Sequence, residues 1–146
     1  MHTPPPFRVT LQPRWADLDP NNHVRHSAYA DYGAQARLVW FAAHGFTAAR
    51  FLELRMGPIL FREELVYQRE IRLGETVHLS VEKLYLSDDG RKWGIFHQFT
   101  KDDGTPVAQI TCDGAWIDLE KRKLAVPPDD LRQALEALPI RPGQPA

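Results

Sequence analysis

The sequence lacks several features that would place a protein in a class at once. It contains a single cysteine, Cys112, so no disulfide can form within the chain, and no C-x-x-C spacing of a zinc ribbon or thioredoxin-like site is present. It has no run of about 18 apolar residues to cross a bilayer. Its first ten residues have neither the charged start nor the apolar stretch of a secretory signal. We therefore expect a cytoplasmic protein that does not insert into a membrane.

An excess of one charge sign is also missing. The 18 basic residues nearly balance the 19 acidic residues, so no overall positive field favours binding to nucleic acid. The motifs G-x-x-x-x-G-K-[ST], G-x-G-x-x-G and G-x-S-x-G do not occur, which leaves nucleotide hydrolysis, nicotinamide binding and a serine-hydrolase elbow without support. The sequence thus predicts no cofactor and no nucleic-acid partner.

What is present is the composition of one ordinary globular domain. The chain has 146 residues, of which 43% are apolar and 25% charged, and a chain of this length can bury a core. No internal repeat or linker divides it. We expect one domain over residues 1–146, with its core at about 7–126, a short helix at about 129–138 and a frayed, Pro-rich end from Pro139.

The first third of the chain predicts a strand followed by a helix. The segment from Phe7 to Gln12 alternates apolar and polar residues, the period of a half-buried strand. After a turn-rich stretch we expect a helix of roughly 17 residues, with Ser27 able to cap its start and Gly45 able to take the left-handed conformation after its end. A second, short helix is expected at about 47–54.

The second half of the chain reads as strands. The charged pair Glu63 and Glu64 interrupts an apolar run and indicates a bulge or a break. A phase shift near Leu84 indicates another bulge. Two Asp-Asp-Gly turns, at 88–90 and 102–104, each separate apolar-rich runs, and Asp-Gly in this setting is a strong hairpin signal. These patterns predict an antiparallel meander.

Together the elements indicate an α+β fold in which a five-stranded antiparallel sheet wraps around a central long helix, because both apolar faces must be buried. The edges of such a sheet carry unpaired backbone groups. Dimerisation that continues the sheet would satisfy those groups. We therefore expect a homo-oligomer, either a dimer or a tetramer.

The chemistry-bearing residues gather in the turn before the predicted helix. One carboxylate, one amide and two imidazoles stand close together there: Asp19, Asn21, His23 and His26. One interpretation is turn chemistry only, with Asp19 satisfying backbone donors. The other is that Asp19 is a general base or nucleophile and that a histidine assists it. The helix start would then supply free N–H groups and a positive dipole end for a developing oxyanion.

Other groups of residues support weaker hypotheses. Asp19, His23 and His26 would need a further ligand to hold a metal, so no metal site is expected. Cys112 lies in a run of strand-type alternation and fits a small core residue better than a nucleophile. Glu63 and Glu64 fit a solvated bulge, with a catalytic carboxylate there as the alternative.

The stretch W-A-D-L-D-P-N-N-H-V-R-H-S-A-Y, followed by a helix and a meander, resembles the acyl-CoA thioesterases of the hotdog fold, in particular the 4-hydroxybenzoyl-CoA thioesterase family. The resemblance implies that Asp19, the second Asp of D-x-D, is the catalytic carboxylate. His26 matches an assisting histidine of some bacterial members, and Tyr29 matches a tyrosine in the first helical turn. Plant acyl-carrier-protein thioesterases of similar fold carry D-x-N-x-H, which matches Asp19, Asn21 and His23.

The resemblance implies hydrolysis of an acyl-CoA to a free acid and coenzyme A, without a cofactor, in an active site between subunits. Asp19 would either activate water or attack the thioester directly. Benzoyl-type members have small residues where Asn21 and Asn22 stand, so the acyl group, aliphatic or aromatic, stays open. The phosphates of coenzyme A would meet cations, and Arg91 and Lys92 on one hairpin edge are the first candidates.

Further candidates and two alternatives complete the sequence-based hypotheses. Arg69 and Arg25 are the next candidates for phosphate contacts. An enoyl-CoA hydratase of the same fold is one alternative, but its motif resembles D-x-N-x-x-H, whereas His23 here follows Asn21 by two positions. The other alternative is a non-catalytic acyl-CoA-binding domain, which needs no carboxylate at Asp19.

Overall fold

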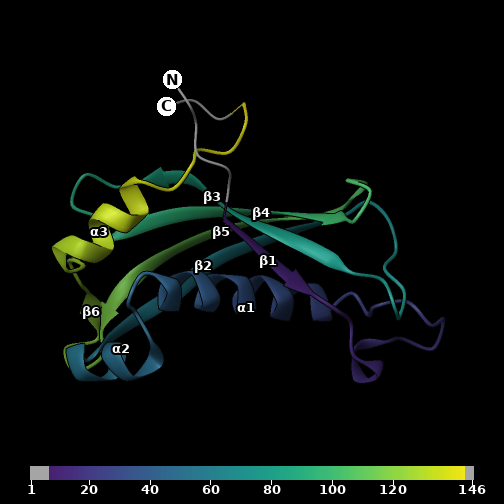
Figure 1. Cartoon of the computed structure of the whole chain (residues 1–146). Helices are drawn as coiled ribbons and strands as arrows, with labels where there is room; N and C mark the ends of the chain where they lie inside the picture. The colour runs from purple at the N-terminus through teal and green to yellow at the C-terminus, as the bar shows by residue number, and fades with distance from the viewer. Residues whose placement is uncertain (1–6, 144–146) are drawn as a thin grey trace.

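The structure is a computed structural model that describes residues 7–143 (Figure 1). Its elements are the strands β1 (Phe7–Leu11), β2 (Met56–Tyr67), β3 (Val77–Leu86), β4 (Lys92–Lys101), β5 (Pro106–Asp118) and β6 (Lys123–Leu124), and the helices α1 (Ala28–Ala43), α2 (Ala48–Leu54) and α3 (Asp129–Glu136). None of the helices in this described part is long and apolar enough to span a membrane.

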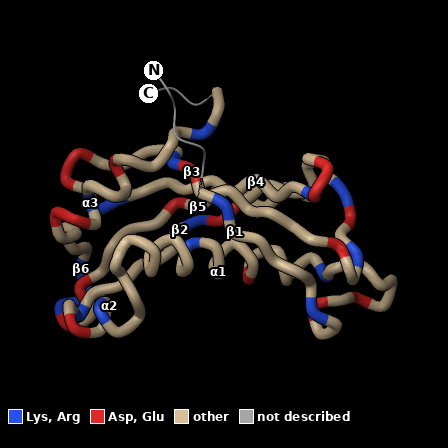
Figure 2. The backbone as a smooth tube through the Cα atoms, viewed as in Figure 1, with Lys and Arg blue, Asp and Glu red and all other residues tan. Residues whose placement is uncertain are grey.

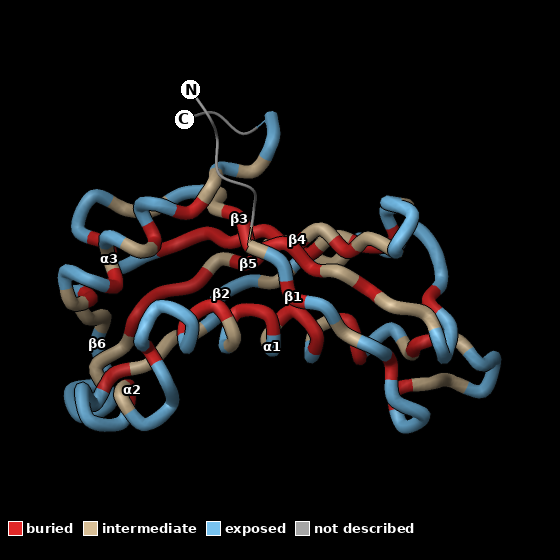
Figure 3. The backbone as a smooth tube through the Cα atoms, viewed as in Figure 1, coloured by how far each residue is buried: buried red, intermediate tan, exposed pale blue. Residues whose placement is uncertain are grey.

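The sheet is antiparallel throughout and has the strand order β1-β3-β4-β5-β2, with the two-residue β6 paired to the end of β5. The expected α+β fold with five main strands is therefore confirmed. Figure 1 shows the sheet curling over α1, with β1 and β2 as its two edges. Figure 3 shows that the buried residues lie where the sheet and α1 face each other.

Helix α1 approaches the sheet closely because its sheet-facing side carries small residues. Ala28 and Ala36 are fully buried. A Cβ atom added at Gly33 would lie only 2.8 Å from Cδ1 of Ile110 on β5, so a side chain there would require the Ile110 side chain to shift. The helix is 16 residues long and ends before Gly45, which has the expected positive φ of 87°.

Both hairpins and the second bulge occur as expected. Gly90 and Gly104 have φ angles of 78° and 85° in the turns that join β3 to β4 and β4 to β5. The register of β3 shifts between Lys83 and Tyr85. Strand β2 is continuous through Glu63 and bulges just before it, so the alternative of a break there is wrong.

Two sequence-based expectations are corrected. Ser27 precedes α1, but its side chain makes no cap hydrogen bond, because its Oγ accepts from Nη1 of Arg25 at 2.6 Å. The fraying expected from Pro139 does not extend over residues 139–141, which are hydrogen-bonded to β3. There the backbone N of Lys83 donates to the carbonyl of Pro139 at 2.8 Å, and the N of Arg141 donates to the carbonyl of Lys83 at 2.9 Å. The last three residues lie outside the described part.

Candidate active site

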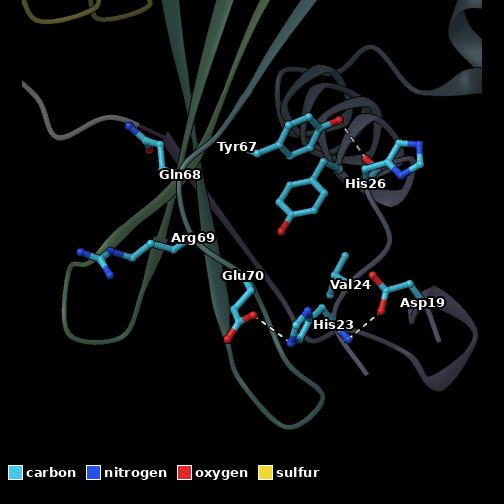
Figure 4. Close-up of a pocket in the computed structure, with 9 residues that line it drawn as sticks. Asp19, His23, Val24, His26, Tyr67, Gln68, Arg69 and Glu70 are labelled. Atoms are coloured by element: carbon cyan, nitrogen blue, oxygen red, sulfur yellow. Dashed lines mark hydrogen bonds and ion pairs between the residues drawn. The ribbon is translucent and has the colours of Figure 1, made fainter. Parts of the chain in front are cut away.

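A cleft of about 330 Å³ lies at the end of the sheet where α1 begins (Figure 4). The loop after β1, the first turn of α1 and the segment that follows β2 form its walls. Its lining residues are Asp19, His23, Val24, His26, Tyr29, Tyr67, Gln68, Arg69 and Glu70. The structure therefore brings together five of the residues singled out in the sequence: Asp19, His23, His26, Tyr29 and Arg69.

The two oxygens of the Asp19 carboxylate have different surroundings. Oδ1 accepts hydrogen bonds from the backbone N of Asn21 at 2.9 Å and of His23 at 3.1 Å, and so closes the turn. Oδ2 accepts no hydrogen bond from any residue between 7 and 143. The turn interpretation and the catalytic interpretation are thus compatible, because one oxygen holds the loop while the other stays available to a substrate or a water.

Asn21 contributes its backbone rather than its amide. Its N–H is one of the donors to Asp19, the residue is exposed, and it is not among the residues that line the cleft. The neighbouring Asn22 has a φ of 65°, a left-handed conformation that asparagine tolerates in tight turns. The structure therefore does not place the Asn21 side chain where it could hold a water or an acyl carbonyl.

His23 is held by a carboxylate from across the cleft. Its Nε2 lies 2.8 Å from Oε2 of Glu70, and the dashed line in Figure 4 marks this contact. The other carboxylate oxygen of Glu70 accepts from Nη2 of Arg72 at 2.7 Å. The hydrogen bond from Arg72, followed by the charges of His23 and Arg72, lowers the pKa of Glu70. His23 therefore faces an ionised carboxylate at neutral pH.

His26 occupies a different position. It is exposed, and Figure 4 shows its imidazole turned away from His23 and Glu70. Its backbone carbonyl accepts a hydrogen bond from the hydroxyl of Tyr67 at 3.1 Å. The side chain of His23, and not that of His26, therefore lies in the ordered polar network of the cleft.

The first turn of α1 has no side-chain cap. The helix begins at Ala28, two positions after the cleft residue His26, and the N–H of Ala28 itself donates to the carbonyl of Arg25 at 3.0 Å. The N–H groups of a first helical turn have no partner within the helix and point out of its N-terminal end, where the helix dipole is positive. This end of α1 is suited to an acyl carbonyl that develops negative charge.

Tyr29 and Tyr67 form the aromatic floor and wall of the cleft. Tyr29 is only 4% exposed, and its ring meets Tyr67 edge to face at 5.1 Å between centroids. Burial, followed by the charges of Tyr67, Asp19 and Glu70, raises the pKa of Tyr29 to about 12. Tyr29 is therefore an uncharged aromatic residue of the cleft, and it lies in the first helical turn as expected.

Asp17, the first acid of the D-x-D motif, is a structural residue. It is 2% exposed, and its carboxylate accepts from Nη2 of Arg14 at 2.9 Å and from the hydroxyl of Tyr32 at 2.7 Å. The hydrogen bond from Arg14 is the largest cause that lowers the pKa of Asp17 to about 2. The hydrogen bond from Tyr32 ties the loop to α1, and of the two acids in the motif only Asp19 lines the cleft.

Arg91 and Lys92 do not belong to the cleft. They follow the β3–β4 turn, at the opposite end of the sheet from the start of α1 (Figure 1). The register explains the separation, because Lys92 pairs near one end of β5 with Ala115, whereas Tyr67 pairs near its other end with Ala108. Charged residues gather in the loops at both ends of the sheet (Figure 2). Of the arginines and lysines considered for phosphate contacts, Arg69 is the one that lines the cleft.

Glu70 and Tyr67 are site residues that the sequence-based reasoning missed. Each follows or ends a strand with no motif around it, so local sequence carries no signal for a site. Glu70 and Tyr67 reach the cleft through pairing between distant segments of the chain. The N–H of Val24 donates to the carbonyl of Ile71 at 2.8 Å, and this bond joins the Asp19 loop to the segment that follows β2.

Cys112 is a buried core residue. The thiol is fully buried, and burial raises its pKa to about 11, which agrees with a core residue. Within residues 7–143, no group of three or more His, Cys, Asp or Glu side chains is arranged to hold a metal ion.

Solved structures of similar fold cover nearly the whole chain. A hypothetical protein of Staphylococcus aureus, solved in complex with CoA, has a TM-score of 0.85 and 19% identity, with 99% of this chain and 94% of that chain covered. A 1,4-dihydroxy-2-naphthoyl-CoA thioesterase from Synechocystis has a TM-score of 0.80 and 14% identity, covering 88% and 94%. A DHNA-CoA thioesterase from Staphylococcus aureus has a TM-score of 0.80 and 17% identity, covering 88% and 87%. At these identities the likeness shows the fold.

The family follows from the sequence itself. No curated protein matches it. The family model described as "Thioesterase-like superfamily" matches residues 13–135, which include the whole cleft. The chain therefore belongs to the thioesterase-like superfamily, which confirms the resemblance seen in its sequence and the expected class of enzyme, a thioester hydrolase.

Proposed function

We propose that the protein is an acyl-CoA thioesterase that hydrolyses an acyl thioester to a free carboxylic acid and coenzyme A in the cleft beside α1. The observation that carries this proposal is the Asp19 carboxylate. One of its oxygens is engaged by the turn, the other accepts no hydrogen bond from the described residues, and the carboxylate lines the same cleft as Tyr29 in the first turn of α1, a helix without a side-chain cap. A nucleophile or base next to preorganised N–H donors is the arrangement that acyl transfer requires.

In this proposal the thioester carbonyl oxygen accepts from the N–H groups of the first turn of α1. Oδ2 of Asp19 then acts by one of two routes. It takes a proton from a water whose oxygen attacks the carbonyl carbon, or it attacks that carbon itself and forms a mixed anhydride that water later cleaves. In both routes the carbon–sulfur bond breaks, and the thiolate of coenzyme A leaves and is protonated.

His23 is the second polar group of the proposed mechanism. Glu70 holds its imidazole by Nε2, so the ring has a defined orientation across the cleft from the Asp19 turn. The backbone of His23 also donates to Asp19, which couples the position of the ring to that of the carboxylate. We assign His23 the role of an assisting residue and Glu70 that of a positioning residue.

In this proposal the substrate carries coenzyme A, and three observations support this choice. A solved structure of similar fold holds CoA, and two others are CoA thioesterases by description. Arg69 lines the cleft and is exposed, so it can meet a phosphate group at the rim. Tyr29 and Tyr67 offer an aromatic surface to the acyl group close to the reacting carbon.

A homodimer that continues the sheet across β2 completes the proposal. Strand β2 is an edge over all of its 12 residues and exposes large apolar side chains, whereas the other edge, β1, has five residues. Phe61 is 60% exposed and Leu60 42%. Pairing of two such edges would cover this surface. Because Tyr67 belongs to both β2 and the cleft, the active site would then lie beside the partner subunit.

The experiment is the release of free thiol from a panel of aliphatic and aromatic acyl-CoA esters. We expect turnover by the natural chain and a loss of at least about a hundredfold in kcat in Asp19→Asn, the lower end of what a positioned base contributes. Asp88→Asn, an exposed turn residue at the far end of the sheet, is the matched control and should keep full activity. Tight binding of acyl-CoA without any turnover would instead indicate an acyl-CoA-binding domain.

A further inference from the structure

Arg37 is a buried cation that no carboxylate of the described residues neutralises. It lies in α1, eight positions after Tyr29, and is 6% exposed. No carboxylate oxygen of residues 7–143 lies within 4.0 Å of its guanidinium. A desolvated charge without an opposite charge is costly, and folded proteins avoid it unless a ligand supplies the partner.

The groups that anchor Arg37 are uncharged. Nη1 lies 3.1 Å from Nε2 of His97 and donates to Sγ of Cys112 at 3.1 Å. Nδ1 of His97 lies 2.7 Å from the carbonyl oxygen of Ser80. Since a carbonyl only accepts, Nδ1 carries the hydrogen and Nε2 accepts from Arg37. Burial and the charge of Arg37 lower the pKa of His97 to about 3, so the imidazole stays neutral.

Arg37 also borders a second hollow. Within the described residues, Nε and Nη2 of Arg37 have no hydrogen-bond acceptor. Arg37 borders a pocket of about 170 Å³ between α1 and the first half of β2, and the indole N–H of Trp93, another lining residue, is buried without a partner. The other lining residues are apolar: Ala34, Leu38, Phe41, Pro58, Ile59 and Leu60.

The pocket therefore combines apolar walls with a fixed, planar set of donors. A guanidinium offers two parallel N–H groups that match the two oxygens of a carboxylate. Glu63 lies opposite Cys112 on the edge strand, and its carboxylate makes no ion pair within 4.0 Å of Arg37. The natural complement of this pocket is an apolar chain that ends in a carboxylate.

We propose that this pocket receives the far end of the acyl group and that the substrate is the thioester of a dicarboxylic acid, whose free carboxylate pairs with Arg37. The inference rests on the proposed function. Helix α1 sets the separation of the two sites, because nine residue steps from Ala28 to Arg37 span about 14 Å at 1.5 Å per residue. Both hollows border β2, with Tyr67 in the cleft and Leu60 in the pocket.

The test measures binding, so it does not depend on turnover. Two non-hydrolysable CoA thioethers of the same chain length, one ending in a carboxylate and one in a methyl group, are titrated into the natural chain by calorimetry. We expect the carboxylate-ended compound to bind at least about tenfold more tightly, the effect of one charge-assisted hydrogen bond. In a series of lengths, the preference should peak at one length, because Arg37 is fixed. Equal binding of both compounds at every length overturns the inference.

Substitutions test whether Arg37 causes the preference for the carboxylate-ended compound over the methyl-ended one. Arg37→Met should abolish it and Arg37→Lys should reduce it, whereas Arg8→Met, an exposed arginine on β1, should leave it unchanged. A preference that persists in a folded Arg37→Met also overturns the inference, and the length series in the natural chain decides the question if that variant does not fold. Thiol release from both kinds of thioester without any difference in binding refutes the dicarboxylic substrate and leaves the thioesterase proposal intact. Preferential binding of the carboxylate-ended compound without thiol release refutes the thioesterase proposal and leaves the pairing of a carboxylate with Arg37 intact.

Discussion

Nε2 of His23 lies 2.8 Å from Oε2 of Glu70, and this contact joins the loop that carries Asp19 to the segment after β2. If Glu70 positions His23 for the reaction, Glu70→Gln should lower kcat/KM by about tenfold, the order of effect of one hydrogen bond to a carboxylate. A pH series of kcat/KM is the measurement. The natural chain and the variant should converge only at acid pH, below the lowered pKa of Glu70, where the natural carboxylate is protonated as well.

Glu75→Gln is the matched control for this experiment. Glu75 lies in the same connection between β2 and β3 but pairs with Lys101 at 2.7 Å, away from the cleft lining. Its substitution should leave the pH profile unchanged. If Glu70→Gln lowers the rate by the same factor at all pH values, Glu70 acts on the shape of the loop and not through its charge.

The position of Arg69 allows the phosphate contact to be tested against the first candidates from the sequence. Arg69→Ala should raise KM for an acyl-CoA by about fivefold, the effect of about 1 kcal/mol for an exposed ion pair, and leave KM for the matching acyl-pantetheine unchanged. Added salt should reproduce this effect by screening. Replacement of Arg91 and Lys92 by Ala, at the far end of the same chain, should change neither KM. An effect of that double substitution on the CoA ester alone would move the nucleotide site to the hairpin.

Asp17 should contribute to stability rather than to catalysis. Its pKa falls from 3.8 to about 2 on folding, so the folded state is stabilised by about 2 kcal/mol at neutral pH. Because the folded pKa is the lower one, this contribution is complete above about pH 4 and is lost as the pH falls towards 2. Urea unfolding of Asp17→Asn should show a deficit of about this size at pH 7 that shrinks in acid. Tyr32→Phe, which removes one donor, should show a smaller deficit, and a pH-independent deficit in Asp17→Asn would contradict the ion-pair explanation.

The exposed edge strand β2 predicts the oligomeric state. Sedimentation at micromolar concentration should give at least about twice the chain mass of 16.7 kDa, because an edge of this length is otherwise unpaired. Phe61→Glu on β2 should shift the protein towards monomers and lower its activity. Leu52→Glu on α2, at a position that is 73% exposed, is the control and should do neither. A natural chain that is monomeric and fully active would exclude a site shared between subunits.

Much of the fold can be read from local sequence because the signals are local. Alternation marks Phe7–Leu11 as a strand, Asp-Gly turns place both hairpins, and Gly45 and Thr47 mark the end of one helix and the start of the next. Asp19 can be found in the same way, since the turn residues around it and the helix after it are contiguous in the chain.

The partners of Asp19 across the cleft could not be found in this way. Glu70, Tyr67 and the unneutralised Arg37 have no motif, and their roles depend on which strands become neighbours in the sheet and on its register. The same register separates Arg91 from Asp19, although both are polar loop residues in the sequence. A short sequence motif specifies backbone conformation over a few residues, whereas the cleft is formed by segments about fifty residues apart that meet only when β2 pairs with β5 and α1 packs under the sheet.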